Sequence, residues 1–259
     1  MQYILQLLIP SIPDDLDLDQ LSPWLDMRRQ PLPPVLSRLA AQSHPRIIKT
    51  HLAVPYLKFS TLAHYIYIAR DGRDVLWSFY QHHLNINEHI YPQLNNNRKD
   101  GMEFPHVDVD VVTYFKRWLE QDGYPFWSFW ENIKSWWELR QHPQVMLMHF
   151  NKLKANPKRE IKKIAEFVGM GSGGFDEKRI DRIVEMTSFE EMKKRATKIM
   201  PGRDDFWKEG AKGFLHKGVN GRWKDVLPKE LSEQYEKMAI EKLGPACAHW
   251  LKTGDFLKE

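Results

Sequence analysis

Residues 64–83 are His64-Tyr-Ile-Tyr-Ile-Ala-Arg70-Asp-Gly-Arg-Asp-Val-Leu-Trp-Ser78-Phe-Tyr-Gln-His-His83, an apolar run followed by a turn and a helical pattern. The apolar run predicts a buried strand that ends at Ala69, and the Asp-Gly pair after Arg70 is typical of a turn. Arg70 is therefore expected at the carboxyl end of a strand, where open α/β sheets bind ligands. Ser78 follows about two helical turns later.

A guanidinium and a hydroxyl at such a position suit a phosphate group, because arginine binds phosphate oxygens with two parallel hydrogen bonds. The alternative is purely structural. Arg70 would then pair with Asp74, and Ser78 would bond to its own helix. These residues alone leave both interpretations open.

The composition indicates a folded protein with an ordinary surface. The chain has 259 residues, of which 42% are hydrophobic and 28% charged, and its net charge is +4. So small a charge favours a local anion site over a nucleic-acid surface, which usually needs a basic stripe. The single cysteine, Cys247, excludes an internal disulfide framework, and a reducing, cytoplasmic compartment is expected.

The order of elements predicts an α/β fold, with a parallel β-sheet flanked by helices on both faces, in one domain over residues 1–259. The apolar start of the chain is too short to span a bilayer, so residues 1–9 are expected to form a buried helix, and no membrane partner is expected. Strands are predicted at 46–50, 65–69 and 144–149. Helices are predicted at 34–42, 72–87, 107–121, 126–141, 157–168, 176–198 and within 228–251, with irregular segments at 10–34, 87–106 and 200–222.

Three further segments carry side chains suited to chemistry. Lys49 and His51 alternate at the end of a predicted strand, which would place a base and a cation on one face. The alternative, which is the more common one for a lone histidine, is a surface lysine and a histidine that caps a loop. Residues 186–192 open a helix with an aromatic residue and a methionine on one side, which suits either a core or the wall of a purine slot. Residues 214–224 combine cations with glycines, as in a surface loop or an anion-binding loop.

In this order and at these spacings, the segments resemble one family, the soluble, cytosolic type of PAPS-dependent sulfotransferase, where PAPS is 3′-phosphoadenosine 5′-phosphosulfate. The resemblance extends from about residue 1 to Trp223. The matching segments are Lys49-Thr-His51-Leu52, Arg70 with Ser78, His149-Phe150-Asn151 with Asn156-Pro-Lys-Arg-Glu160-Ile161, Thr187-Ser-Phe189 with Met192, and His216-Lys217-Gly218 with Gly221-Arg-Trp223-Lys224.

The resemblance implies a P-loop nucleotide-kinase-like fold, PAPS as co-substrate without a metal, and a small, partly apolar acceptor. His51 would accept the acceptor's proton, and Lys49 would stabilise charge on the transferred group. The residues implied for the 3′-phosphate are Arg70, Ser78, His216, Lys217 and Gly218, and those implied for adenosine are Thr187, Phe189 and Met192.

The chain departs from the family pattern at several positions. Ala53 stands where proline is usual, Phe150 replaces a tyrosine, and His216 replaces an arginine, which would weaken the grip on the 3′-phosphate. The C-terminal dimer motif of the Lys-Thr-Val-Glu type is also not visible after Trp223.

The largest departure concerns the phosphosulfate loop. The family begins with a strand and a Pro-Lys-Ser-Gly-Thr-Thr-Trp loop that holds the 5′-phosphosulfate, and residues 1–8 resemble the helix after that loop. The interpretation from sequence is a truncated sulfotransferase domain with little activity of its own. One other hypothesis stays open, and a further one lacks the motif that it needs. The chain could be a non-catalytic remnant that binds 3′-phosphoadenosine or another protein. A nucleoside kinase would need a Gly-x-x-x-x-Gly-Lys-Ser/Thr loop, which this sequence lacks.

Overall fold

The computed structural model describes residues 1–13, 16–96, 103–125, 127–171, 176–200, 205–215 and 218–257. The chain divides into two compact units, each assembled from three separate segments. Unit 1 comprises Met1–His51, Leu84–His106 and Ile161–Gly218, and unit 2 comprises Leu52–His83, Val107–Glu160 and Val219–Glu259.

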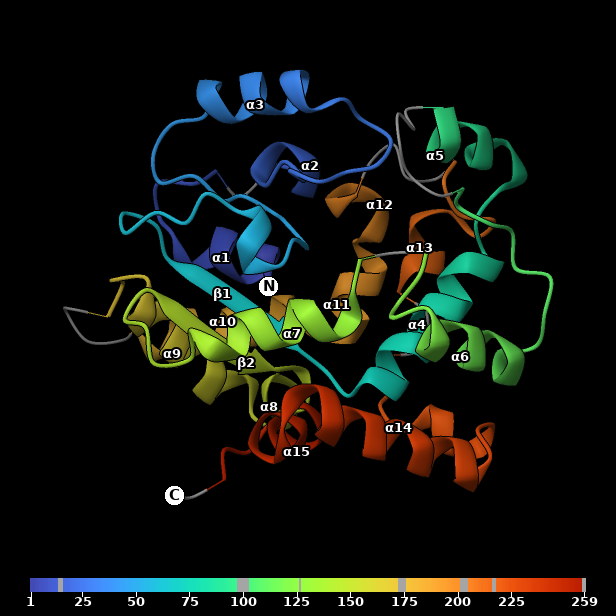
Figure 1. The fold of residues 1–259 in the computed structure, drawn as a ribbon. Helices are drawn as coiled ribbons and strands as arrows, with labels where there is room; N and C mark the ends of the chain where they lie inside the picture. The colour runs from blue at the N-terminus through green and yellow to red at the C-terminus, as the bar shows by residue number, and fades with distance from the viewer. Residues whose placement is uncertain are drawn as a thin grey trace. The chain divides into compact units, whose positions relative to one another are not determined.

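Unit 2 contains the sheet. Strands β1 (Tyr65–Ala69) and β2 (Val145–His149) pair in parallel, so that Ala69 lies opposite His149 (Figure 1). Both strands are where the apolar runs predict them. Parallel pairing brings the two carboxyl ends to one edge, and Arg70 and Phe150 therefore follow the strands at that edge. The predicted α/β class with parallel strands is confirmed, and the sheet has two strands among the described residues.

Helices form most of the rest of unit 2. Helix α4 (Gly72–Leu84) follows β1 directly, as predicted, and α14 (Lys229–Leu243) packs against α7 (Phe129–Glu138) and α15 (Pro245–Thr253). Together they bury an aromatic core in which Leu76, Phe115 and Trp250 are at most 1% exposed. The other elements of this unit are η1 (Val54–Tyr56), α6 (Val111–Glu120), α8 (Phe150–Ala155) and η3 (Arg222–Asp225). Helix α9 (Pro157–Phe167) begins in unit 2, and its residues from Ile161 on belong to unit 1.

Unit 1 is helical. Helix α1 (Gln2–Leu8) packs against α2 and α10, and the guanidinium of Arg179 on α10 donates to the carbonyls of Leu7 and Leu8, which end α1. The prediction of a buried helix at the start of the chain is confirmed. The remaining elements are α2 (Leu18–Leu21), α3 (Leu32–Ala41), η2 (Glu88–Ile90), α5 (Tyr91–Asn96), α10 (Glu177–Met186), α11 (Phe189–Lys194), α12 (Ala196–Ile199) and α13 (Gly210–Phe214).

The predicted strand at residues 46–50 is wrong. Lys49 forms only an isolated bridge with Trp24, in which Lys49 N donates to the Pro23 carbonyl and Leu25 N donates to the Lys49 carbonyl. Because Pro23 has no N–H group, it cannot donate to a longer ladder. Ile48 is also 49% exposed, so the segment is not buried on both faces as a central strand would be. The segments predicted as irregular contain the short helices α2, η2, α5 and α13.

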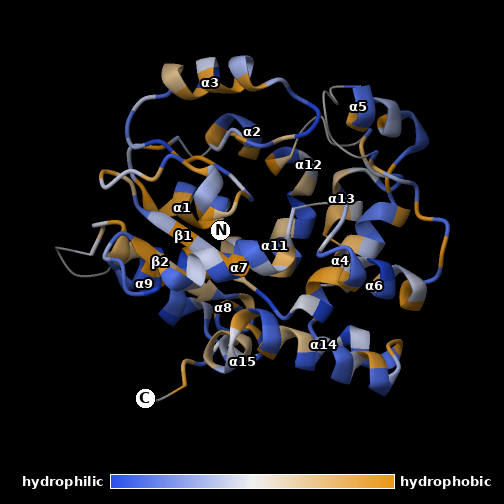
Figure 2. Cartoon of the chain, viewed as in Figure 1, coloured by the Kyte–Doolittle hydropathy of each residue, from blue (hydrophilic) through white to orange (hydrophobic). Residues whose placement is uncertain are grey.

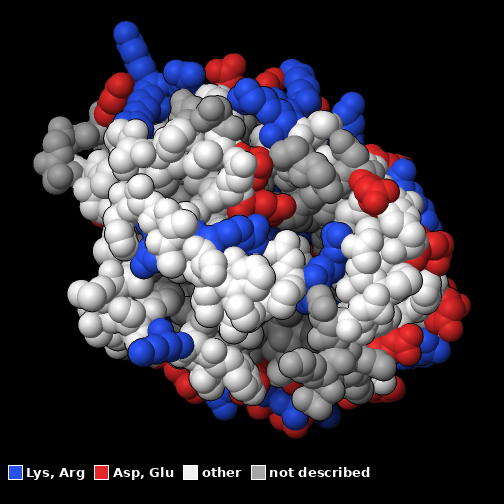
Figure 3. Space-filling model, turned by 90° about the horizontal axis from the view of Figure 1, so that it is seen from above, with Lys and Arg blue, Asp and Glu red and all other residues white. Residues whose placement is uncertain are grey.

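Hydrophobic and hydrophilic residues alternate along several helices, and charges of both signs lie on the surface. Figure 2 shows hydrophobic and hydrophilic residues side by side along α3 and α14, and Figure 3 shows basic and acidic side chains intermixed on the face that it draws. In the described ranges, no helix has the length and apolar character needed to cross a membrane.

Candidate functional site

Arg70 directly follows the carboxyl end of β1, and its side chain is partly exposed. Its guanidinium lies 4.8 Å from the ring of Phe150, its Nη2 donates to the Val219 carbonyl at 3.2 Å, and the same atom is 3.6 Å from Oδ1 of Asp74. The side chain is 20% exposed. Burial lowers the pKa of Arg70, and the carboxylates of Asp74 and Asp71 act against that effect. Within the described part of the chain, the buried Nε of Arg70 has no hydrogen-bond partner. One guanidinium donor at this edge of the sheet therefore has no bond to a described residue.

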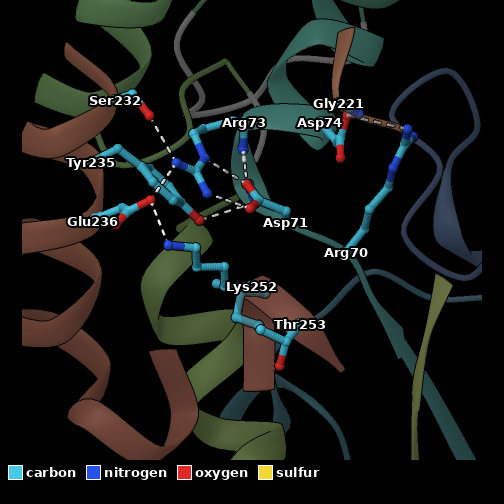
Figure 4. A network of polar contacts seen from close by, with 12 residues as sticks. Arg70, Asp71, Arg73, Asp74, Gly221, Ser232, Tyr235, Glu236, Lys252 and Thr253 are labelled. Atoms are coloured by element: carbon cyan, nitrogen blue, oxygen red, sulfur yellow. Dashed lines mark hydrogen bonds and ion pairs between the residues drawn. The ribbon is translucent and has the colours of Figure 1, made fainter. Parts of the chain in front are cut away.

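The segment 219–222 lies beside Arg70 and Asp74 and is bonded to both. Asp74 accepts the N–H of Gly221 at 2.7 Å, while Gly221 adopts a φ of 82°, in the left-handed region that glycine tolerates best. Figure 4 shows Arg70, Asp74 and Gly221. The guanidinium of Arg222 lies 5.2 Å from the ring of Trp77 on α4. The carboxylate of Asp74 therefore holds the backbone of this segment next to the guanidinium of Arg70.

Ser78 lies on α4, four residues after Asp74, and is partly buried. Residues four apart lie on the same face of a helix, so Ser78 is one turn beyond the carboxylate that faces Arg70. The ion pair between Arg70 and Asp74 was the structural alternative considered from the sequence, and it is present at 3.6 Å.

Arg73, three residues further, has a different setting, which Figure 4 shows. Its guanidinium is 2% exposed and lies 3.9 Å from the ring of Trp223. Asp71 accepts two hydrogen bonds from it at 3.0 and 2.6 Å, and Ser232 and Glu236 on α14 accept at 2.8 and 2.7 Å. Arg73 thus connects the turn after β1 to α14. This role of Arg73 was missed from the sequence, because the spacing of Arg73 gives no sign of partners on α14.

In unit 1, Lys49 and His51 meet at the indole of Trp24. Lys49 Nζ lies 3.8 Å from the ring centroid, and the His51 ring lies 4.6 Å from it. Burial, with a smaller effect from the charge of Lys49, lowers the pKa of His51 to about 3. The imidazole is therefore neutral at physiological pH and able to accept a proton. The alternation predicted from sequence does bring the two side chains together, although no strand forms.

Residues 187–192 build the start of α11. Ser188 caps the helix by accepting the N–H of Glu191, and the Thr187 hydroxyl donates to the Ile183 carbonyl at 2.7 Å. Gly218, in the same unit but far along the sequence, lies against the ring of Phe189. A Cβ atom at Gly218 would meet that ring at 2.5 Å, and its φ is 58°. The structure therefore brings together Phe189 and Gly218, two of the predicted site residues.

The remaining predicted residues have varied outcomes. His216 and Lys217 lie outside the described residues. Met192 lies on α11, one turn after Phe189. Among the described residues, no cluster of three His, Cys, Asp or Glu side chains is arranged to hold a metal ion. Trp24 and Asp26, which surround His51, were missed because they fall in a proline-rich stretch without periodicity.

Comparison with known proteins identifies the class. The family model described as the sulfotransferase domain matches residues 13–245. Sulfotransferase 1A1 of Canis lupus familiaris is 29% identical over 228 residues, which are 85% of this chain and 70% of that protein. Sulfotransferase 1A1 of Mus musculus is 31% identical over 225 residues, covering 83% of this chain and 68% of the relative. Sulfotransferase 1E1 of Homo sapiens is 29% identical over 219 residues, with the same two coverages of 83% and 68%.

Solved structures share the fold. A retinol dehydratase in complex with androsterone and the inactive cofactor PAP aligns with a TM-score of 0.73 at 20% identity, over 93% of this chain and 76% of that one. A mouse sulfotransferase, SULT7A1, complexed with PAP aligns with a TM-score of 0.68 at 19% identity, over 96% and 82%. These two likenesses show the fold, and the family match over residues 13–245 shows the class. The chain belongs to the sulfotransferase family.

Proposed function

We propose that this protein transfers a sulfuryl group from PAPS to a hydroxyl or amine group of a small, partly apolar acceptor. Family membership supports the reaction type. Two structural neighbours contain PAP, one of them with androsterone, and a third solved complex contains retinol and PAP, which favours an adenine nucleotide co-substrate and an apolar acceptor.

Arg70 carries the proposal. It follows β1 directly, where α/β folds bind ligands, and its Nε has no partner among the described residues. We assign the 3′-phosphate to Arg70 and Ser78 in unit 2. His216, Lys217 and the backbone of Gly218 are assigned to the same group through the family resemblance. Thr187, Phe189 and Met192 are assigned to adenosine, with the ring of Phe189 as the stacking surface.

The chemistry follows from the residues at Trp24. A neutral His51 accepts the proton of the acceptor hydroxyl while the acceptor oxygen bonds to sulfur. The bond between sulfur and the bridging phosphate oxygen breaks, and adenosine 3′,5′-bisphosphate (PAP) leaves with that oxygen. Lys49 supplies a positive charge to the transferred group. Positioning and charge stabilisation provide most of the catalysis, as in phosphoryl transfer.

A second function, binding without transfer, is favoured by one observation. The printed sequence contains no Pro-Lys-Ser-Gly-Thr-Thr-Trp segment. A polypeptide of these 259 residues alone is therefore expected to bind 3′-phosphoadenosine compounds and to transfer sulfate poorly. We also propose that residues 1–259 act as a single sulfotransferase domain, since the family match spans segments of both units, and that the protein works in the cytoplasm.

Calorimetric titration with PAP tests the proposal. Arg70→Ala should weaken binding about 10- to 100-fold, because a hydrogen bond to a charged group contributes about 1.5–3 kcal/mol. Arg117→Ala is the matched control, since Arg117 is an exposed arginine of the same unit that pairs with Asp108 at 3.3 Å. It should bind PAP like the wild type. Adenosine 5′-monophosphate, which lacks the 3′-phosphate, should bind weakly and equally to all three proteins.

Unchanged PAP affinity in Arg70→Ala would overturn the phosphate assignment. Incubation with radiolabelled PAPS and a panel of phenols, alcohols and amines separates the two functions. Robust transfer by the 259-residue polypeptide would contradict the expectation of binding alone, and would establish the transfer reaction directly.

A further inference from the structure

The corner around His51 contains a carboxylate that the family resemblance did not assign. Asp26 is 15% exposed on its side chain, and its Oδ2 lies 4.0 Å from Nδ1 of the His51 ring. We propose that Asp26 is a positioning residue for His51, which fixes the proton of the neutral imidazole on Nδ1 and leaves Nε2 as the base. The inference rests on the proposed function of His51.

Asp26 is itself held in place by several bonds. Its Oδ1 accepts the indole N–H of Trp24 at 3.0 Å, and both carboxylate oxygens accept the backbone N–H of His51, at 3.1 and 3.2 Å. The Trp24 segment is joined to the His51 segment by the two backbone bonds around Lys49. The carboxylate therefore keeps its position relative to the ring because donors from both segments bind it.

The indole of Trp24 restrains the ring from a second direction. The ring planes of Trp24 and His51 are tilted by 54° with centroids 4.6 Å apart. An imidazole that packs against an indole while its Nδ1 faces a carboxylate has little freedom to turn over. A residue that fixes a base in this way acts through orientation, and Asp26 does not need to touch the substrate.

The charge of Asp26 selects the tautomer. A carboxylate only accepts hydrogen bonds, and a neutral imidazole carries its proton on one of two nitrogens. The nitrogen that faces Asp26 is stabilised when it carries the proton, so the lone pair is left on Nε2. The separation of 4.0 Å is longer than a hydrogen bond, and such catalytic contacts often shorten when substrate binds. In serine proteases the aspartate of the triad has the same effect on its histidine.

Asparagine at position 26 should reverse this preference. The two donors that Asp26 accepts, from Trp24 and the His51 backbone, would hold the amide oxygen of Asp26→Asn. Its NH₂ group would then face the ring and donate to Nδ1, so that the imidazole proton moves to Nε2. The base nitrogen would be blocked while the shape of the corner stays the same.

Two-bond ¹H–¹⁵N correlation spectra of histidine side chains, recorded on the ligand-free protein, test the proposal. In the wild type, His51 should carry its proton on Nδ1, and in Asp26→Asn on Nε2. Asp26→Glu, which restores a carboxylate, should return the proton to Nδ1. Asp205→Asn is the matched control, because Asp205 lies 2.8 Å from Nε2 of His89 in the same unit. It should leave the His51 signals unchanged.

A wild-type His51 protonated on Nε2, or the same tautomer in the wild type and in Asp26→Asn, would overturn the inference. In the Asp26 variants, the other ten of the 11 histidines report whether the protein folds, since their signals should not shift. No nucleotide is present in the experiment, so its outcome is independent of the PAP titration. If the wild-type protein did not bind PAP, the proposed function would be refuted, while the tautomer result would still stand.

Discussion

Arg70 and Arg73 leave the same turn after β1, yet their guanidinium groups have contrasting surroundings. Arg73 donates four hydrogen bonds, to Asp71, Ser232 and Glu236, and is 2% exposed. Arg70 is 20% exposed, donates to the Val219 carbonyl, and is 3.6 Å from Asp74. Burial lowers the pKa of Arg73 too, but its bonds to Asp71 and Glu236 reverse the effect and raise it.

We propose that the contrast separates an anchor, Arg73, from a binding group, Arg70. A guanidinium has five N–H donors, and Arg73 uses four of them within the protein, so little of it is left for a ligand. Arg70 keeps a donor that no described residue binds. We infer that Arg73 holds the turn against the C-terminal helices so that Arg70 can reach an anion from a rigid support.

Removing Arg73 should have the largest effect. Arg73→Ala leaves the buried Asp71 carboxylate without its partner, which should lower the free energy of unfolding by about 3–5 kcal/mol. Urea denaturation followed by circular dichroism measures this change. Arg73→Lys keeps the charge but loses the fork that binds Asp71 with two bonds, and should fall between the wild type and Arg73→Ala.

Arg70→Ala is the contrast for that experiment. Its pair with Asp74 is partly exposed and longer, so the free energy of unfolding should fall by no more than about 1 kcal/mol. The effects on PAP affinity should have the opposite order. Among variants that still fold, Arg70→Ala should lose the most affinity for PAP. Equal losses of stability in Arg70→Ala and Arg73→Ala would contradict the distinction between anchor and binding group.

Gly72, between the two arginines, should show how tightly the turn is held. Its N–H donates to the Tyr235 hydroxyl at 3.0 Å, and a Cβ atom there would meet that hydroxyl at 2.5 Å and the Phe129 ring at 2.6 Å. Gly72→Ala should therefore lower the free energy of unfolding by about 1–3 kcal/mol, as overpacking of a filled core does. The same urea denaturation measures it.

A double variant tests the cause of that loss. Tyr235→Phe removes the hydroxyl, so adding it to Gly72→Ala should relieve part of the clash, and the two losses should sum to more than the loss in the double variant. Strict additivity would show that the hydroxyl does not limit the space at Gly72, and that the turn is looser than the structure indicates.

The sequence predicted the local elements of this region and left its long-range partners undetermined. The apolar runs located β1 and β2, and the Asp-Gly pair located the start of α4, because each is a pattern of neighbouring residues. Arg73 gave no such sign, since its partners Ser232 and Glu236 lie more than 150 residues further on. A turn arginine followed by several possible acceptors looks the same whether it anchors or binds.

Unit 1 shows the same limit. The apolar pair after Arg46 predicted a strand, but Pro23 in the neighbouring segment prevents the ladder from extending. The sequence alone does not show that the segment with Pro23 lies beside residues 46–50. The closeness of Lys49 and His51 was predicted, whereas the contact of both with Trp24 was not. The roles of His216 and Lys217 stay predictions.

The smallest effect concerns two carboxylates, Asp74 beside Arg70 and Glu236 beside Arg73. Burial raises the pKa of Asp74 more than Arg70 and Gly221 lower it. The fold therefore disfavours the ionised form, and protonation adds stability as the pH falls through the raised pKa. Burial acts in the same direction on Glu236, but its bonds to Lys252 and Arg73 outweigh it and lower the pKa. The contribution of Glu236 is thus full above its ordinary pKa and is lost as the pH falls through the lowered one.

Asp74→Asn and Glu236→Gln should therefore change the pH dependence of stability in opposite directions. At neutral pH, Asp74→Asn should leave the free energy of unfolding unchanged or slightly higher, because the amide oxygen can still accept the Gly221 N–H. Glu236→Gln should lower it by less than about 1 kcal/mol, and the loss should vanish in acid. Urea denaturation at several values between about pH 3 and pH 7 measures both curves. If the two variants shifted the curve in the same direction, the electrostatic difference between the surroundings of Arg70 and Arg73 would be refuted, even if their difference in hydrogen bonding held.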